Sequence, residues 1–164
     1  MKTLVIGLGN PILSDDGIGI YTARRVQELL PEESPIEVIE VSVGGITLME
    51  HMVGYERVII IDAMWAPADQ AGQVHVFDAS NLPETLNTRS THDADLPTAL
   101  RIGRELGAKL PEMHHVQIVA ITANQVLDFC EELTPAVQAA MPDACTAVFR
   151  LLSIPASSVE QETK

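Results

Sequence analysis

Three short apolar runs constrain the fold of this chain more than any other feature of its sequence. They are rich in β-branched residues and apolar on both faces, the pattern of strands that lie buried between helical layers. The runs span Thr3 to Ile6, Val58 to Ile61 and Val116 to Ile121. A fourth run, Ile36 to Val43, alternates more and fits a strand nearer the sheet edge. The chain is therefore expected to form a central sheet covered by helices.

Segments with helical spacing of apolar residues separate these runs. Gly17 to Leu30 lies between the first and the fourth run, and strand, helix, strand is the opening unit of a parallel α/β sheet. A short helical piece is expected around Leu48 to Met52, and a longer helix from about Asp95 through Leu106, with Pro97 in its first turn. The last helix should run from Thr134, a suitable N-cap, to about Leu152.

A fifth strand is expected from Gln73 to Phe77. The gap before it, Ala63 to Gly72, is too short for a crossover helix, so this strand should run antiparallel to its predecessor. The predicted fold class is α/β, a three-layer sandwich with a twisted, mostly parallel five-stranded sheet that includes one antiparallel strand. The 164 residues suit one core, so we expect a single domain over residues 1–152 and a polar C-terminal tail over residues 153–164.

Net charge and hydropathy exclude several classes of partner. The formal net charge of −13 repels phosphate backbones and anionic lipid, which argues against nucleic acid. No apolar stretch approaches the ~20 residues of a membrane span. The first apolar run is shorter than the core of a signal peptide, so a cytoplasmic location is expected.

Cys130 and Cys145 match neither a disulfide scaffold nor a zinc knuckle, and we expect both thiols to be buried.

The loop after the first strand holds the densest signal. Gly7-Leu8-Gly9 resembles the start of a dinucleotide fingerprint, but Ile12 stands where that fingerprint needs its third glycine. Asp15 and Asp16 would also meet an anionic pyrophosphate with like charge. Nucleotide binding is therefore disfavoured.

Asp15 and Asp16 allow two interpretations. An aspartate at a helix start can accept backbone N–H bonds and complement the helix dipole. One aspartate is enough for that task, and the second stands at the carboxyl end of a central strand, where α/β proteins place their sites. Asp16 is thus either a helix cap or a ligand.

Asp62 directly follows the buried run Val58 to Ile61, where an ionised carboxylate needs a donor network or a cation. Because its strand is predicted to be parallel to the first, Asp16 and Asp62 should emerge at the same edge of the sheet. Neither segment places a Lys or Arg nearby, since Arg57 lies at the opposite end of its strand. Two converging carboxylates in this setting favour a cation between them.

His92 lies in a polar segment just before the helix that starts near Asp95. A lone histidine in a loop is ordinarily a solvated side chain. Together with Asp16 and Asp62, however, it makes a three-ligand set with open positions for a divalent transition ion. Serine and cysteine nucleophiles are poorly supported because the chain has no G-x-S-x-G elbow. The remaining histidines are expected to be structural or surface residues: His51, His75, His114 and His115.

Several of these stretches together resemble the maturation endopeptidases of nickel-iron hydrogenases, which remove a C-terminal peptide from the hydrogenase large subunit. The matching stretches occur in the family's order and cover nearly the whole chain except the tail. They are GLGNPILSDDGIG near the start, Gly44-Gly45, IIIDA ending at Ala63, STHDADLPTAL around His92, and ELTPAVQAAMPDA at residues 132–144.

The resemblance implies a phosphorylase/hydrolase-like fold and nickel-contacting roles for Asp16, Asp62 and His92. The nickel belongs to the substrate, a nickel-loaded large-subunit precursor, and serves as the recognition element; other divalent ions such as cadmium or zinc are expected to occupy the site in vitro. Family members often carry Glu where this chain has Asp16, which retracts the carboxylate. The catalytic residues stay open, with Asp16 and Asp62 as candidates for an aspartyl-type endopeptidase.

Two other functions compete with this one. A non-cleaving metal-dependent binding module or chaperone could recognise the same subunit. Peptidyl-tRNA hydrolases also open with a strand leading into GLGNP, but they need a catalytic His shortly after that loop, and here no His occurs before His51.

Overall fold

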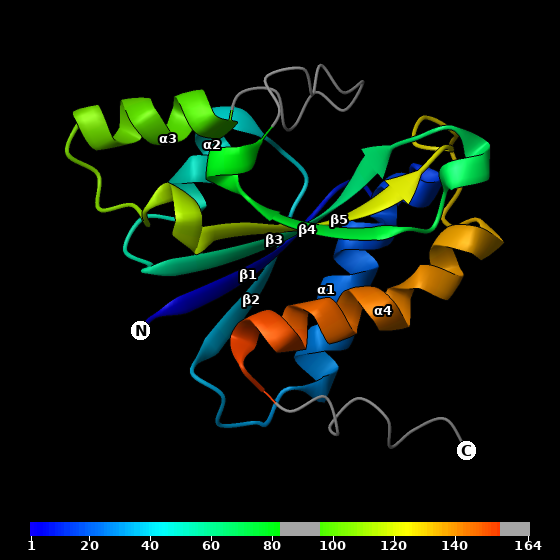
Figure 1. Cartoon of the computed structure of the whole chain (residues 1–164), viewed down its shortest axis with the longest axis horizontal. Coiled ribbons are helices and arrows are strands. Elements are labelled where there is room, and N and C mark those ends of the chain that lie inside the picture. Colours follow the sequence, from blue (N-terminus) through cyan, green and yellow to red (C-terminus); the bar gives the residue numbers. More distant parts are fainter. Residues whose placement is uncertain (83–95, 155–164) are drawn as a thin grey trace.

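The computed structural model describes residues 1–82 and 96–154, which form an α/β sandwich around a five-stranded sheet (Figure 1). The strands lie in the order β2-β1-β3-β5-β4. The strands are β1 (Thr3–Leu8), β2 (Ile36–Val41), β3 (Arg57–Trp65), β4 (Val74–Asp78) and β5 (Val116–Ala123). The α-helices are α1 (Ile18–Leu29), α2 (Gly45–His51), α3 (Leu96–Glu105) and α4 (Pro135–Leu152). Short 3-10 helices are η1 (Ser14–Gly17), η2 (Ala68–Gln70), η3 (Ala79–Asn81) and η4 (Met113–His115).

The sheet is parallel except for β4. β1 pairs in parallel with both β2 and β3, and β3 pairs in parallel with β5. β4 runs antiparallel to β5, and hence also to β3, which confirms its predicted direction. β4 does not lie beside β3, however, because β5 is inserted between them. The predicted fold class is thus confirmed.

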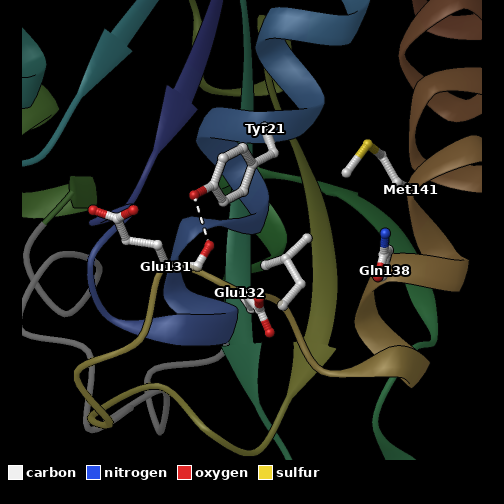
Figure 2. A pocket seen from close by; sticks show the side chains of 6 residues that line it. Tyr21, Glu131, Glu132, Gln138 and Met141 are labelled. Carbon is white, nitrogen blue, oxygen red and sulfur yellow. Dashed lines mark hydrogen bonds between the residues drawn. The ribbon is translucent and has the colours of Figure 1, made fainter.

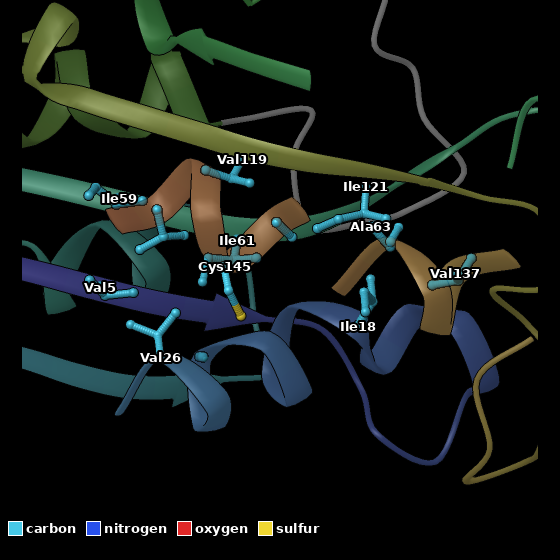
Figure 3. Close-up of a cluster of buried hydrophobic side chains, with 14 of the residues drawn as sticks. Val5, Ile18, Val26, Ile59, Ile61, Ala63, Val119, Ile121, Val137 and Cys145 are labelled. Carbon is cyan, nitrogen blue, oxygen red and sulfur yellow. The ribbon is translucent and has the colours of Figure 1, made fainter. Parts of the chain in front are cut away.

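Helices cover both faces of the sheet, as Figure 1 shows: α1 and α4 lie on one side, α2 and α3 on the other. Alternate residues of β3 face the two layers, since Ile59 and Ile61 belong to the core under α1 and α4 while Val58 and Ile60 belong to the core under α2 and α3. Figure 3 shows the first core, in which Val5 and Ile18 pack near Ile61. Burial on both faces explains why these strands are continuous apolar runs.

Two glycines let α1 pack directly against the strands. A Cβ on Gly19 would lie 2.2 Å from the carbonyl oxygen of Leu8 and 2.3 Å from that of Ile61. A Cβ on Gly7 would lie 2.6 Å from Ala23 Cβ. Gly7, which suggested a phosphate loop, thus serves close packing of helix on sheet together with Gly19, and this packing fixes the start of α1 above β1 and β3.

Two local predictions need correction or refinement. Cys145 is buried, as expected, but Cys130 is exposed, because it lies in the loop between β5 and α4 rather than in a core-facing element. Thr134 occupies the N-cap position of α4, yet its hydroxyl makes no cap bond to that helix. It interacts instead with Asp15, as described below.

The end of α4 at Leu152 coincides with the predicted end of the domain. Residues 155–164 lie outside the described residues, so the division into a 1–152 domain and a 153–164 tail stays a prediction. Within residues 1–82 and 96–154, none of the helices has the length and apolarity needed to cross a bilayer. The cytoplasmic location also stays a prediction.

Candidate functional site

Asp16 and Asp62 both lie toward the carboxyl edge of the sheet, Asp16 in η1 after β1 and Asp62 in the neighbouring strand β3. β1 ends at Leu8, and its pairing with β3 ends where Gly7 faces Ile61. Asp62 is therefore the first β3 residue beyond the β1 ladder. η1, which carries Asp16, packs against β3. The two side chains are only 5% and 4% exposed, respectively, so both carboxyl groups are buried polar groups.

Asp62 lies inside β3 rather than at its end. The strand continues to Trp65, and Asp62 pairs with Ala120 of β5. By strand alternation its side chain points to the same face as Ile60, the face covered by α2 and α3. One carboxylate oxygen, Oδ1, accepts a hydrogen bond from the backbone N–H of Ala63 at 2.8 Å. Because β1 stops pairing with β3 at Ile61, the Asp62 carboxylate lies just beyond the last residue pair of these two strands.

The Asp16 side chain stabilises the loop that precedes it, between β1 and η1. Its Oδ2 accepts a hydrogen bond from the backbone N–H of Asn10 at 2.8 Å. The loop turns at Gly9, where a φ of 138° disfavours other residues and where an added Cβ would lie only 2.0 Å from the Asp16 carbonyl oxygen. The N-cap of α1 is Gly17, and no side-chain cap bond forms there. Asp16 is thus not the N-cap residue of α1, and its role as a ligand stays a prediction.

Asp15 has a separate, structural task. Its Oδ1 accepts the backbone N–H of Thr134 at 2.7 Å, and its Oδ2 accepts the Thr134 hydroxyl at 2.9 Å. The side chain is completely buried. Asp15 therefore ties the loop after β1 to the start of α4, a contact between residues 119 positions apart. The sequence alone did not reveal this role. Its one signal was that the chain has two adjacent aspartates where a helix start needs a single cap.

The third predicted ligand, His92, lies outside the described residues, so its position relative to the aspartates stays a prediction. Among residues 1–82 and 96–154, no group of three or more His, Cys, Asp or Glu side chains could hold a metal ion. Three of the other histidines are exposed and one is half-buried, in agreement with the surface or structural role expected of them: His51, His75, His114 and His115.

A pocket of about 510 Å³ opens beside the candidate site, between α1 and the start of α4 (Figure 2). In Figure 2 the Tyr21 hydroxyl points to the carbonyl oxygen of Glu131, to which it donates at 3.0 Å. The Pro11 carbonyl oxygen lies 3.3 Å from the same hydroxyl. Neither Asp16 nor Asp62 lines the pocket; its lining residues are Tyr21, Glu131, Glu132, Leu133, Gln138 and Met141.

Comparisons with known proteins agree with this architecture. Residues 20–151 match the model of a family described as hydrogenase maturation protease. The chain is 28% identical over 116 residues to the hydrogenase 2 maturation protease of Escherichia coli K12, covering 67% of this chain and 70% of that protein.

Solved structures are also similar. The hydrogenase maturating endopeptidase HybD from Escherichia coli superposes with a TM-score of 0.78 at 26% identity, covering 93% of each chain. A nickel-iron hydrogenase maturation protease HybD from Thermococcus kodakarensis gives 0.74 at 28% identity, covering 92% of this chain and 99% of that one. The family match spans most of the chain, and each of the two solved structures covers more than nine-tenths of it. This chain therefore belongs to the hydrogenase maturation protease family, and is a hydrolase.

Proposed function

We propose that this protein removes the C-terminal peptide of a nickel-iron hydrogenase large-subunit precursor after nickel has been inserted. The nickel is part of the substrate and acts as the recognition element, and Asp16, Asp62 and His92 are its ligands on this protein. Membership of the protease family supports the cleavage, and the similar protein from Thermococcus kodakarensis is a nickel-iron hydrogenase maturation protease.

The observation that carries the proposal is the burial of two carboxylates at one edge of the sheet, on β3 and on the loop after the neighbouring β1. A buried carboxylate is stable only with donors or a cation around it. The sheet and the loop after β1 hold both carboxylates at this edge, where an ion carried by a partner would meet anionic oxygen ligands in fixed positions.

The chemistry of the proposed ligands suits a nickel ion that another protein already holds. Carboxylate oxygens and one imidazole nitrogen leave coordination positions open for the ligands of the precursor. His92 belongs to the stretch between β4 and α3, which is long enough in sequence to reach the carboxyl edge where the aspartates lie. Because Asp16 is shorter than Glu, it is expected to change metal distance or preference without abolishing binding.

The test is to incubate the purified protein with nickel-loaded precursor and with the same precursor prepared without nickel. Mass spectrometry should show loss of a C-terminal peptide only from the nickel-loaded form. Binding without any mass loss would favour the non-cleaving module or chaperone, and equal cleavage of both forms would contradict recognition through nickel.

The catalytic residues stay open, with Asp16 and Asp62 as the candidates, and binding and catalysis can be separated by experiment. A metal-free precursor with an engineered contact to this protein removes the need for nickel in recognition. Cleavage of that precursor would assign the ion to recognition alone. No cleavage, with binding intact, would assign it a part in hydrolysis as a Lewis acid or an activator of water.

A further inference from the structure

Large apolar side chains are concentrated at the edge of the sheet where the candidate site lies. Within residues 1–82 and 96–154, six of the ten exposed large apolar residues follow the carboxyl ends of parallel strands. They are Ile12 after β1, Val43 and Ile46 after β2, Trp65 at the end of β3, and Leu127 and Phe129 after β5. Phe129 is 86% exposed and Leu127 is 66% exposed. Exposed large apolar side chains that gather at one edge of a sheet point to an interaction site.

Backbone hydrogen bonds hold the segment beside Phe129 against the loop after β1. The next residue, Cys130, donates its backbone N–H to the Ile12 carbonyl oxygen at 3.1 Å, and its own carbonyl oxygen accepts the N–H of Ser14 at 2.6 Å. Leu13 and Cys130 form a parallel bridge, which makes Ile12 and Phe129 neighbours on the two strands of that bridge. Figure 1 shows these two loops side by side at the same end of the sheet.

Further bonds couple this loop to the segment that carries Asp16. The Asp15 N–H donates to the Gln125 carbonyl oxygen at 3.0 Å, and the Ser14 hydroxyl donates to the Glu132 carbonyl oxygen at 3.0 Å. The Asp15 carboxylate binds Thr134, and Tyr21 donates to Glu131. A partner that binds Phe129 is therefore held at a fixed position relative to Asp16.

The charge around these side chains is negative. Residues 124–134 contain Asp128, Glu131 and Glu132 and no Lys or Arg, and the whole chain carries a net charge of −13. An apolar surface with an acidic border complements a partner segment that carries apolar and basic side chains.

We propose that the apolar tip made of Ile12, Leu127 and Phe129 is the docking surface for the large-subunit precursor, which binds it through a segment with apolar and basic side chains. The proposal rests on the proposed function for the identity of the partner. It adds a second attachment point beside the metal ligands: the tip supplies affinity, and the coupled loops present the bound precursor to Asp16 and Asp62.

The test uses a Leu127→Ser/Phe129→Ser double variant of the full chain, with Leu106→Ser as the matched control. Leu106 is 83% exposed but follows α3, which ends far from the carboxyl edge of the strands in Figure 1. Processing kinetics with nickel-loaded precursor should show KM raised at least about tenfold in the double variant, with kcat changed less than about twofold. The control should keep wild-type values. All three proteins should melt at similar temperatures, since the substituted side chains are exposed.

A binding measurement separates this proposal from the proposed function. In an Asp62→Asn background, which blocks turnover, the double substitution should weaken precursor binding by the same factor as it raises KM. If wild-type protein fails to cleave but binds precursor through the tip, the proposed function fails and the docking surface stands. If cleavage occurs with KM and Kd within about twofold of wild type in the double variant, the docking surface is wrong.

Two further outcomes test the chemistry of the partner. Added salt should weaken binding, and Asp128→Asn/Glu132→Gln should reduce that salt dependence because it removes part of the acidic border. Binding that salt leaves unchanged would contradict a basic partner segment. Sedimentation of the protein alone should show a monomer; a dimer that the double variant dissociates would mean that the tip binds a second copy of this chain, which overturns the proposal.

Discussion

Asp15 and Asp16 show how adjacent residues of one type can have different tasks. Asp15 turns toward α4 and binds the backbone and the hydroxyl of Thr134, whereas Asp16 accepts the N–H of Asn10 within its own loop. Both are buried, so each carboxylate depends on the groups that face it. The two residues are therefore expected to respond differently to substitution.

Asp15→Asn should lower the free energy of unfolding by about 1–3 kcal/mol, because the amide replaces one acceptor oxygen with a donor that faces the N–H and hydroxyl of Thr134. Urea denaturation measures the effect. Thr134→Val removes the hydroxyl alone, and a double-mutant cycle should show that the two losses are not additive. Additive losses would mean that the bond at 2.9 Å adds little to stability.

Asp62→Asn should abolish processing of nickel-loaded precursor while the protein stays folded, since the amide keeps the size of the side chain but is a poor metal ligand. His92→Ala should have the same effect on processing. Asp69→Asn is the control, because Asp69 is an exposed carboxylate in η2. Precursor processing and circular dichroism check the three variants. Wild-type rates in Asp62→Asn and His92→Ala would contradict the assigned ligands.

At the scale of elements, the position of the candidate site depends on how closely α1 approaches the sheet. The position that a Cβ of Gly19 would take faces the carbonyl oxygens of Leu8 and Ile61, so the first turn of α1 lies directly over the end of β1 and the middle of β3. η1 and Asp16 immediately precede that turn. A helix held farther from the strands would carry Asp16 away from β3.

Gly19→Ala should therefore destabilise the protein by at least about 3 kcal/mol or prevent folding, although alanine is the better helix former. The added Cβ would lie 2.2 Å and 2.3 Å from two backbone oxygens, which cannot move without separating helix from sheet. Gln27→Ala, at an exposed position of the same helix, should change stability by less than about 0.5 kcal/mol. Thermal and urea unfolding compare the two. Equal stability of both variants would show that α1 can shift without cost.

At the scale of the whole molecule, the two thiols differ in their exposure to solvent. Cys130 is exposed in the loop after β5, and Cys145 is buried in the core between α4 and the sheet. A thiol reagent should modify one cysteine in the native protein and the second only after unfolding. Mass spectrometry of the alkylated protein counts the modified thiols, and rapid native labelling of both would contradict the burial of Cys145.

Burial raises the pKa of the Cys145 thiol from its ordinary value of 9.0 to about 11. The folded state therefore favours the neutral thiol, and this contribution is complete below pH 9 and lost as the pH rises toward 11. The loss should be on the order of 2 kcal/mol. Chemical unfolding at several pH values should show a shallower decline of stability over this interval in Cys145→Ala than in wild type. Parallel declines would mean that the thiol does not ionise on unfolding.

The fold class and the sheet edge at which Asp16 and Asp62 lie were predictable from the sequence. Buried strands between helices must be apolar on both faces, so the runs Thr3 to Ile6, Val58 to Ile61 and Val116 to Ile121 predicted the central strands. The short gap before Gln73 gave the direction of β4. Both predictions rest on local features of the sequence: the pattern of apolar residues within a strand and the length of the segment between two strands.

Which residues meet across long separations became visible only in the folded chain. That β5 lies between β3 and β4, that Asp15 binds Thr134 and that the exposed loop of Phe129 is bonded to the loop of Asp16 all depend on pairings between distant segments. Each pairing depends on the free energy of packing the whole core, so it cannot be predicted from a local sequence pattern. For the same reason two neighbouring aspartates look alike in the sequence and have different partners in the fold.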